Sequence, residues 1–227
     1  MRKVLVTGSN RGIGLEIVKQ LARSNNFVFM SCRDLNKGME SLKKIEASLH
    51  SNIKLIELDV TKEESIEKAL NEIKELDAVI NNAGINYDTW QNTLNADLKN
   101  VHETFETNFF GVWRVCQKAV PLLRKSKHPR IVNVSSEAGA LNSMEGGAPG
   151  YCSSKAALNA LTICLASDLK KDHILVNSVC PGWIATDMGG SGGGPVSEGA
   201  KSVLWALDLK DNGPTGGFFR QGQRLDW

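Results

Sequence analysis

The sequence has no long apolar run, no cysteine cluster and almost no excess of charge. No stretch reaches the ~18 consecutive apolar residues that a membrane-spanning helix needs. The 5 cysteines are an odd number for a disulfide framework, and none of them forms a Cys-x-x-Cys pair or a metal-like cluster. With 27 basic and 25 acidic side chains, the formal net charge is +2, so neither a nucleic acid nor a membrane is indicated as a partner.

Little sequence precedes the first apolar run, Val4-Leu5-Val6. This leaves no room for a cleavable signal segment. Together with the absence of a disulfide pattern, it predicts a cytoplasmic protein whose cysteines stay reduced, most of them as small buried side chains.

The chain is hydrophobic at 41% of its 227 residues, which is typical of a folded globular protein. Short apolar runs alternate with amphipathic segments at helical spacing, so we expect a single α/β domain over residues 1–227, with a doubly wound parallel sheet and helices on both faces. We also expect helix N-caps at Asp34 and Thr61. The predicted strands are Val4–Thr7, Phe27–Ser31, Ile53–Leu58, Ala78–Asn81, Ile131–Ser135 and Ile174–Val179.

The first predicted strand runs into a glycine-rich turn and then into a helix. In such a unit Gly8 makes the tight turn, Gly12 leaves room for a pyrophosphate, and Gly14 lets the helix approach the strand. The spacing Gly-x-x-x-Gly-x-Gly differs from the commoner dinucleotide motif, and a turn without a ligand is the alternative. The cofactor-binding residues predicted in this turn are Gly8, Ser9, Asn10, Arg11, Gly12, Ile13 and Gly14.

The end of the second strand predicts which dinucleotide binds. A carboxylate at this position holds the ribose 2′-hydroxyl of NAD, whereas a 2′-phosphate needs cations. Here neutral Cys32 precedes Arg33, and Arg11 from the turn can join Arg33 in a two-arginine clamp. The alternative is that Arg33 is a solvated surface residue. The sequence therefore favours NADP(H).

Tyr151 and Lys155 lie four residues apart and share one face if their segment is helical. A neighbouring cation favours the phenolate and lowers the pKa of a tyrosine, which makes it a better acid-base group near neutrality. A Tyr-x-x-x-Lys spacing alone also arises by chance, so its significance depends on the rest of the chain.

Seven ordered motifs make the chain similar to the short-chain dehydrogenase/reductase family from Val4 to Trp227. The segments Thr7–Leu15 and Gly216–Arg220 resemble its carbonyl-reductase-like branch, which includes sniffer and C-factor relatives. The motifs are Thr7-Gly8-x-x-x-Gly12-x-Gly14, Asp59-Val60, Asn81-Asn82-Ala83-Gly84, Asn108, Ser135-Ser136, Tyr151-x-x-x-Lys155 and Pro181-Gly182-x-x-x-Thr186.

The resemblance implies NADPH-dependent reduction of a ketone, aldehyde or quinone by hydride transfer. Tyr151 would donate the proton, Ser136 would bind the same oxygen, Lys155 would hold the nicotinamide ribose and lower the tyrosine pKa, and Asn108, within a long helix, would bind a water. Ser135 is the alternative to Ser136. Asp59 and Val60 would contact the adenine, and Asn82 and Gly84 the cofactor ribose region. Further cofactor contacts are implied for Ala83, Tyr151, Lys155, Pro181, Gly182, Ile184 and Thr186.

Two loops are expected to form the substrate site, residues 137–150 and 183–200. They lack arginine and lysine around the reactive centre, which favours a small apolar or aromatic carbonyl compound. We expect the glycine-rich segment Gly189–Pro195 to be a mobile lid. The predicted pocket residues are Ser136, Ile85, Tyr87, Trp90, Met144, Trp183 and Met188.

Other interpretations stay open at this point. A hydroxysteroid or 3-oxoacyl reductase would use the same catalytic residues, and a signalling protein could bind NADP without turnover. Cys152 is either redox-sensitive or inert and buried.

The loop 137–150 lacks the large insertion of the monomeric vertebrate carbonyl reductases, so we expect a homodimer or homotetramer.

Overall fold

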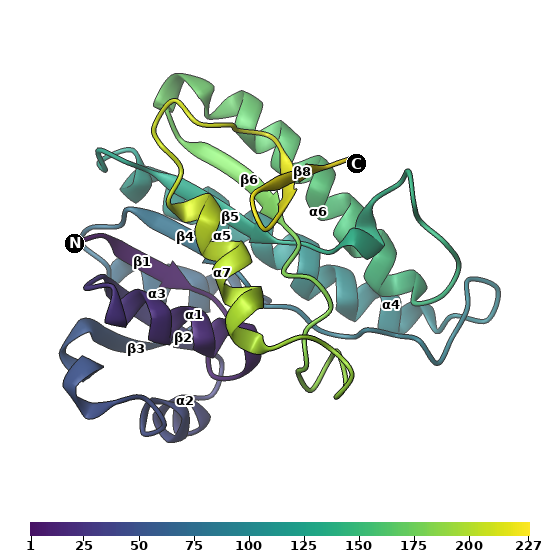
Figure 1. Cartoon of the computed structure of the whole chain (residues 1–227), viewed down its shortest axis with the longest axis horizontal. Coiled ribbons are helices and arrows are strands. Elements are labelled where there is room, and N and C mark those ends of the chain that lie inside the picture. Colours follow the sequence, from purple (N-terminus) through teal and green to yellow (C-terminus); the bar gives the residue numbers. More distant parts are fainter.

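The computed structural model describes all 227 residues and is built around one eight-stranded sheet (Figure 1). Its strand order is β3-β2-β1-β4-β5-β6-β7-β8, and all neighbouring pairs are parallel except β7 with β8. The order of strands reverses at β1 and β4, as in doubly wound sheets. This confirms the predicted fold class. The strands are β1 (Lys3–Val6), β2 (Phe27–Cys32), β3 (Ile53–Glu57), β4 (Ala78–Asn81), β5 (Arg130–Val134), β6 (Leu175–Val179), β7 (Phe218–Arg220) and β8 (Gln223–Leu225).

Helices cover both faces of this sheet, as Figure 1 shows. None of them combines the length and apolar character that crossing a bilayer requires. The α-helices are α1 (Gly12–Arg23), α2 (Leu35–Leu42), α3 (Glu63–Asn71), α4 (Leu98–Phe105), α5 (Val112–Leu123), α6 (Pro149–Asp168) and α7 (Val196–Leu207). Short 3-10 helices are η1 (Ala47–Asn52), η3 (Glu137–Gly139) and η4 (Lys170–Asp172), and η2 (Glu106–Gly111) is a π-helical turn.

The hydrophobic core has two layers, one on each face of the sheet. Successive side chains of a strand point to opposite faces. In β1, Val4 and Val6 therefore join the buried cluster under α1 and α7, whereas Leu5 joins the cluster under α3, α5 and α6. Each fully buried aliphatic side chain of this kind contributes ~1.5–3 kcal/mol through loss of contact with water. Burial on both faces is why these strands are continuously apolar.

The predicted strands all exist, with ends that differ by at most one residue. Strand β4 covers Ala78–Asn81 as predicted, and β1 begins at Lys3, one residue before the predicted start. The sequence missed β7 and β8, which have 3 residues each and follow Gly216-Gly217. Runs this short carry no usable periodicity; β7 pairs with the edge of β6, and β8 pairs with β7.

One of the two predicted helix caps is confirmed. The Asp34 carboxylate accepts hydrogen bonds from the backbone N–H groups of Asn36 and Lys37 at 3.0 and 3.2 Å and caps α2. The prediction for Thr61 is wrong, because α3 begins after Lys62 without a side-chain cap. The Thr61 hydroxyl instead donates to Asp59 Oδ1 at 2.7 Å, which closes a local turn at the end of β3.

The long helix predicted around Asn108 is interrupted. It consists of α4, the π-helical turn η2 and α5, and Asn108 lies in η2 with no exposed surface. Such turns are rare and are often found at functional sites. In Figure 1 the loops that follow β4, β5 and β6 leave the sheet on the same side, so the residues on them gather at the carboxyl edge of the sheet.

Candidate active site

The turn between β1 and α1 requires glycine at three positions. Gly8 and Gly12 have φ angles of +60° and +53°, which side chains disfavour. A Cβ added to Gly8 would lie 2.8 Å from Ala83 Cα, and one added to Gly14 would lie 2.4 Å from Asn82 Nδ2. The turn is therefore packed directly against the end of β4.

The start of α1 can accommodate an anion. Arg11 is the N-cap residue and its side chain makes no capping hydrogen bond, so the first N–H groups of α1 have no side-chain partner there. Helix N-termini favour negative charge. At Gly12 an added Cβ would meet only the Thr186 side chain, at 3.5 Å. These features fit the pyrophosphate of a dinucleotide.

Two other residues of the turn use their polar groups within the protein. The buried Ser9 hydroxyl donates to Ser31 O at 3.2 Å, and Asn10 O accepts from the Ser41 hydroxyl at 2.6 Å. Ile13 is half-buried. Any contact that Ser9 or Asn10 makes with a cofactor must therefore come from groups that these bonds leave free.

The Asn82 side chain holds the turn to β4. Its amide donates to Thr7 O at 2.9 Å and to Gly8 O at 3.0 Å, and the Thr7 hydroxyl accepts from the backbone N–H groups of Asn82 and Ala83. Thus Asn82 and Ala83 support the nucleotide end structurally. Neighbouring Asn81 is buried and donates to Asn133 Oδ1 at 2.8 Å inside the sheet. The predicted contacts with a cofactor ribose stay a prediction.

Arg33 is available at the end of β2. It is exposed, and it takes part in none of the ion pairs of the chain. Burial raises the pKa of the neighbouring Cys32 thiol, so that side chain stays neutral. Arg33 thus faces no negative charge from position 32, as the sequence predicts.

Arg11 differs from the expected clamp. Its guanidinium pairs with Asp187 at 2.9 Å, a residue of the loop after β6. Both side chains are largely exposed, so the pair contributes about 1 kcal/mol or less. Arg11 therefore already has a carboxylate partner, which the sequence did not predict because 176 positions separate the two residues.

The predicted adenine contacts lie at the end of β3. Asp59 Oδ1 accepts from the backbone and the hydroxyl of Thr61, so one carboxylate oxygen is occupied. Val60 is buried against Gly111, where an added Cβ would lie 2.8 Å from Val60 Cγ2. These contacts fix the loop, and an adenine contact stays a prediction.

Ser136, Tyr151 and Lys155 come together at the carboxyl ends of β4 and β5. Ser136 follows β5, its hydroxyl accepts from Ala138 N at 3.2 Å, and it lies close enough to the Tyr151 phenol to act on its pKa. Lys155 Nζ lies 5.6 Å from the centre of the Tyr151 ring and donates to Val134 O at 2.8 Å. A Cβ added to Gly84 would lie 3.7 Å from Lys155 Nζ. The structure thus brings the predicted catalytic side chains to one place.

Asn108 completes this group. Its Oδ1 accepts from Ile85 N at 2.9 Å, and its Nδ2 donates to Ile85 O at 3.2 Å and to Ser154 Oγ at 3.1 Å. The buried amide therefore joins the loop after β4 to α6. A Cβ on Gly84 would lie 3.5 Å from Asn108 Oδ1, so the amide is adjacent to Lys155.

Ser135 is turned away from this group. Its hydroxyl donates to Asn159 Oδ1 at 2.6 Å within the buried interior. Because Ser136 reaches Tyr151 and Ser135 does not, the geometry favours Ser136 as the site serine. Cys152 is also turned away, and burial raises the pKa of its thiol, which favours the inert form.

Burial controls the protonation of the two central residues. It raises the pKa of Tyr151 well above its ordinary value, although the neighbouring Ser136 hydroxyl acts in the opposite direction. It lowers the pKa of Lys155 to about 8. The expected lowering of the tyrosine pKa by Lys155 is therefore wrong for this structure, because loss of solvation is the larger effect. Tyr151 is a neutral phenol that can donate a proton.

Of the predicted pocket residues, Tyr87 packs directly on the predicted catalytic tyrosine, and the others differ in their exposure. The Tyr87 ring packs edge-on against the Tyr151 ring with centroids 5.1 Å apart. Ile85 and Met144 are half-buried. The largely exposed side chains are Tyr87 (43%), Trp90 (67%), Trp183 (68%) and Met188 (39%). Large aromatic and thioether surfaces open to solvent suit an apolar ligand.

The segment predicted as a lid is internally bonded. The Trp183 indole N–H donates to Gly189 O at 2.8 Å, and Ile184 and Thr186 pair with Gly194 and Gly190. Gly182, before this segment, has a φ of +88° and follows Pro181. Thr186 of this segment lies beside Gly12, since a Cβ added to Gly12 would be 3.5 Å from the Thr186 side chain. The segment is therefore next to the nucleotide end.

Arg220 is a residue of this region that the sequence analysis missed. From β7 it pairs with Glu137 Oε2 at 2.7 Å, directly after Ser136, and its guanidinium lies against Gly182. Both loops predicted to lack cations thus have an arginine at their base. No local pattern indicates it, because β7 reaches this position only through the order of strands.

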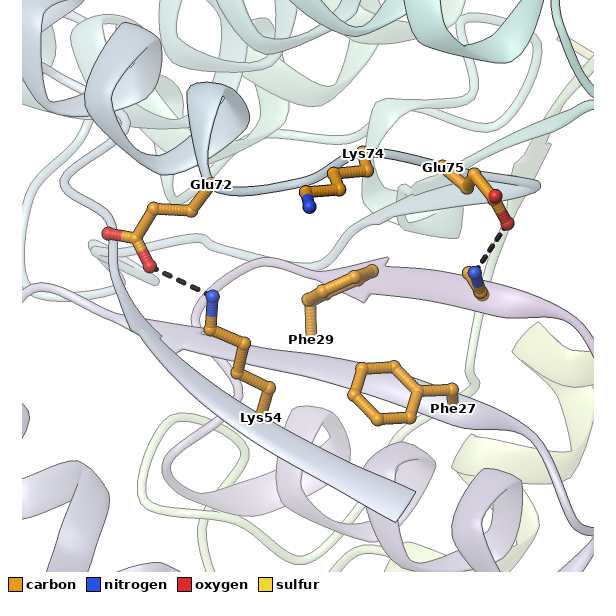
Figure 2. A pocket seen from close by; sticks show the side chains of 7 residues that line it. Phe27, Phe29, Lys54, Glu72, Lys74 and Glu75 are labelled. Atoms are coloured by element: carbon orange, nitrogen blue, oxygen red, sulfur yellow. Dashed lines mark hydrogen bonds and ion pairs between the residues drawn. The ribbon is translucent and has the colours of Figure 1, made fainter. Parts of the chain in front are cut away.

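A separate hollow of about 270 Å³ lies at the opposite edge of the sheet (Figure 2). Phe27 and Phe29 form its floor, and ion pairs of Lys3 with Glu75 and of Lys54 with Glu72 flank it. Lys3 and Phe27 are the first residues of their strands, so this hollow is at the amino edge, away from Tyr151. No group of three or more His, Cys, Asp and Glu side chains could hold a metal ion.

Comparisons with known proteins agree with this geometry. The sequence profile of the family described as short chain dehydrogenase matches residues 2–193. Salutaridine reductase of Papaver bracteatum is 32% identical over 294 residues, which cover 96% of this chain and 94% of that protein. The alignment is longer than the 227 residues of this chain, so the relative carries segments that are absent here.

Two solved structures are similar over their whole length. NADPH-bound carbonyl reductase from chicken fatty liver has a TM-score of 0.89 and 33% identity, with 100% of this chain and 99% of that chain covered. Carbonyl reductase Sniffer of D. melanogaster has a TM-score of 0.89 and 30% identity, with 100% of both chains covered.

Proposed function

The chain belongs to the short-chain dehydrogenase family of oxidoreductases, and from this premise we propose that it reduces a carbonyl group to an alcohol with NADPH. The observation that carries the proposal is the neutral phenol of Tyr151, which loss of solvation protects from ionisation and which lies beside Ser136 and Lys155. A proton donor, a second hydroxyl and a cation at one point are what a developing alkoxide requires.

The residues at the nucleotide end fit NADP(H). The turn Gly8–Gly14 and the start of α1 would hold the pyrophosphate, and Arg33 would meet the 2′-phosphate. Residues of the loop after β6 would hold the nicotinamide end, Pro181, Gly182, Ile184 and Thr186. When bound, NADPH supplies the hydride. The carbonyl reductase from chicken fatty liver, which was solved with NADPH bound, supports this assignment.

The protein residues perform the proton chemistry. Tyr151 transfers its phenolic proton to the substrate oxygen, and the Ser136 hydroxyl donates a hydrogen bond to that oxygen. The Lys155 ammonium stabilises the negative charge that Tyr151 acquires, since its Nζ is close to the ring. Asn108 holds the loop after β4 in place beside Lys155 and, as the resemblance implies, would bind a water that connects Lys155 with solvent.

The proposed substrate is a small apolar or aromatic ketone, aldehyde or quinone. The Tyr87 ring against Tyr151 and the exposed aromatic side chains of Trp90 and Trp183 on the loops after β4 and β6 support this class. A panel of quinones, aromatic aldehydes, ketosteroids and acyl thioesters, followed by loss of NADPH absorbance, tests it. Turnover confined to acyl thioesters or to ketosteroids would favour the alternative reductases, and no turnover with any class would contradict the proposal.

Replacing Arg33 by Ala is expected to weaken NADPH binding by about 10- to 100-fold, because hydrogen bonds to a charged group contribute ~1.5–3 kcal/mol. Binding of NADH should change by less than about twofold, since NADH has no 2′-phosphate. Fluorescence titration of both cofactors measures the effect. Lys37→Ala removes an exposed cation of α2 nearby and serves as the control. Equal losses for NADPH and NADH would contradict the assignment of Arg33.

We also propose that the protein forms a homodimer or homotetramer through α4, η2, α5 and α6. Leu98, Phe110, Trp113 and Ile163 on these elements are 68%, 43%, 40% and 44% exposed. The rings of Phe109, Phe110 and Trp113 pack in a continuous row. Exposed apolar surface of this kind favours contact with another subunit.

Sedimentation at micromolar concentration is expected to show a dimer or tetramer, and Trp113→Glu should shift it to monomer, because a carboxylate would be buried in the interface. Met39→Glu places the same charge on the exposed face of α2 and should leave the oligomer intact. A wild-type protein that sediments only as a monomer would contradict the proposal.

The proposed location is the cytoplasm. All 5 cysteines are free, and four of them are buried. A chain without disulfides is typical of reducing compartments.

A further inference from the structure

Asp88 is a buried carboxylate without a cationic partner. It lies in the loop after β4, has no exposed surface and forms no ion pair. Its Oδ1 accepts from Tyr151 N at 2.9 Å, and its Oδ2 accepts from Gly150 N at 2.9 Å and from Gln91 Nε2 at 2.7 Å. A buried charge is unfavourable unless such bonds compensate for lost water. A buried carboxylate with these partners therefore indicates a specific structural role for Asp88.

The carboxylate replaces the missing cap of α6. The N-cap residue Ala148 has no side-chain oxygen and adopts a left-handed conformation with φ +44°, and Pro149 has no N–H. The N–H groups of Gly150 and Tyr151 are the second and third of the helix, those that an N-cap side chain normally binds. Asp88 binds both from more than 60 positions earlier in the chain.

The surroundings of the helix start are shaped for this contact. A Cβ added to Gly150 would lie 3.1 Å from Asp88 Oδ2, so a larger residue would press on the carboxylate. Burial acts to raise the pKa of Asp88, but hydrogen bonds from Gln91 and from the backbone of Tyr151 and Gly150 more than compensate and keep it below its usual value. The group is thus held as a carboxylate at the positive end of α6.

The same loop is fixed to the other side of the site. Gln91 Oε1 accepts from Asp97 N at 3.0 Å, at the start of α4, and Asn86 Nδ2 donates to Thr104 Oγ1 at 3.1 Å. Tyr87, next to Asp88, packs its ring on the Tyr151 ring. The loop therefore contacts Tyr151 at two points. Asp88 accepts from the Tyr151 backbone N–H, and the Tyr87 ring packs on the Tyr151 ring.

We propose that Asp88 is the positioning residue of the catalytic tyrosine. Its carboxylate sets the backbone of Tyr151 and the start of α6 relative to Asn108 and α4, so that the phenol meets the substrate oxygen in a productive orientation. The inference rests on the proposed function, because it assigns Tyr151 as the proton donor. It also predicts a backbone effect that does not depend on any substrate.

The tests are Asp88→Asn and Asp88→Ala. Asparagine has the same shape but directs an NH₂ group at a backbone N–H, so it loses one bond, whereas alanine loses all of them. We expect kcat to fall about 10-fold for Asp88→Asn and about 100-fold for Asp88→Ala, as for small misplacements of reacting groups, with substrate KM and NADPH affinity within about twofold. Asp97→Asn removes the exposed carboxylate that caps α4 and is the matched control; its kcat should stay within about twofold.

Amide hydrogen exchange gives the second readout. The exchange of at least one of the N–H groups of Gly150 and Tyr151 should accelerate about fivefold or more in Asp88→Asn, and exchange of both should remain unchanged in Asp97→Asn, because only the former loses a bond to these groups. Asp88→Asn is used alone if the alanine variant does not fold.

The outcomes separate the two proposals. Unchanged exchange and unchanged kcat in a folded Asp88→Asn variant would overturn the role of Asp88. Faster exchange with an unchanged kcat and a raised KM would also overturn it, since that pattern shows weakened substrate binding and not a misplaced phenol. Wild-type protein that reduces no carbonyl substrate, but shows faster exchange in Asp88→Asn, would contradict the proposed function and leave the backbone effect intact.

Discussion

Replacing Tyr151 by Phe is expected to lower kcat by about 1,000-fold or more, because general acid catalysis contributes ~10²–10⁴-fold and Phe has no proton to transfer. Loss of solvation raises the pKa of the half-buried phenol, so in the wild-type protein the proton is present throughout the physiological pH range. Phe retains the ring that packs against Tyr87, so the shape of the site should be preserved. This is the largest effect on activity that the structure predicts.

NADPH binding should change by less than about twofold in Tyr151→Phe, since the nucleotide end is formed by other segments. Steady-state kinetics and fluorescence titration measure the two quantities separately. Ser153→Ala removes an exposed hydroxyl two residues away on the same helix and provides the control. A Tyr151→Phe protein that retains a tenth or more of the wild-type rate would show that another group donates the proton.

Replacing Lys155 by Met is expected to lower kcat by about 100-fold, because the cation that stabilises the charged tyrosine is lost. The same change should raise stability at neutral pH. Burial lowers the pKa of Lys155 from 10.5 to about 8, and this difference corresponds to ~3 kcal/mol against the charged form in the folded state. Met removes that cost but also the hydrogen bond to Val134 O, worth ~1 kcal/mol, so we expect a gain of about 2 kcal/mol.

The stability difference between Lys155→Met and the wild type should depend on pH. Below pH 8 the lysine is protonated in both the folded and the unfolded state, and the cost of its buried charge is fully present. Between pH 8 and 10.5 the unfolded state binds the proton and the folded state does not, so wild-type stability rises with pH. Above 10.5 both states are neutral and the cost has gone.

Chemical denaturation of both proteins at pH 7 and pH 9.5 measures this change. The free energy of unfolding of the wild type should rise by ~2 kcal/mol relative to Lys155→Met. Other titrating groups are common to both proteins and cancel in the difference. A stability difference that is the same at both pH values would mean that Lys155 keeps an ordinary pKa.

Local sequence patterns were sufficient for most of the fold. The strands β1 to β6 are runs of apolar residues bounded by turns, and burial on both faces of a parallel sheet makes such runs continuous. Asp34 was identified as a cap because the cap and the N–H groups that it binds are neighbours in sequence. Thr61 is also of a residue type favoured at N-caps, but its hydroxyl is bound to Asp59, and a capping rule does not weigh this competition between near neighbours.

The catalytic group could be predicted only in part. Tyr151 and Lys155 lie on one helix, so their spacing indicates a shared face. The choice of Ser136 over Ser135 depended on which hydroxyl meets Tyr151 and which meets Asn159, a matter of side-chain direction at the end of β5. The pKa direction of Tyr151 was wrong because a spacing shows the neighbouring cation but not how completely the phenol is buried.

By itself the sequence determined the fold class, the glycines of the nucleotide turn and the residue types of the proton-transfer group, because these follow from local geometry and short spacings. Only the tertiary structure decided which distant residues meet them. Asp88 reaches the start of α6, Arg220 reaches Gly182, and Asp187 reaches Arg11, because the order of strands brings loops far apart in the chain to one edge of the sheet. It also decided the protonation of Tyr151 and Lys155, since solvation is lost only when the surrounding elements close over a side chain.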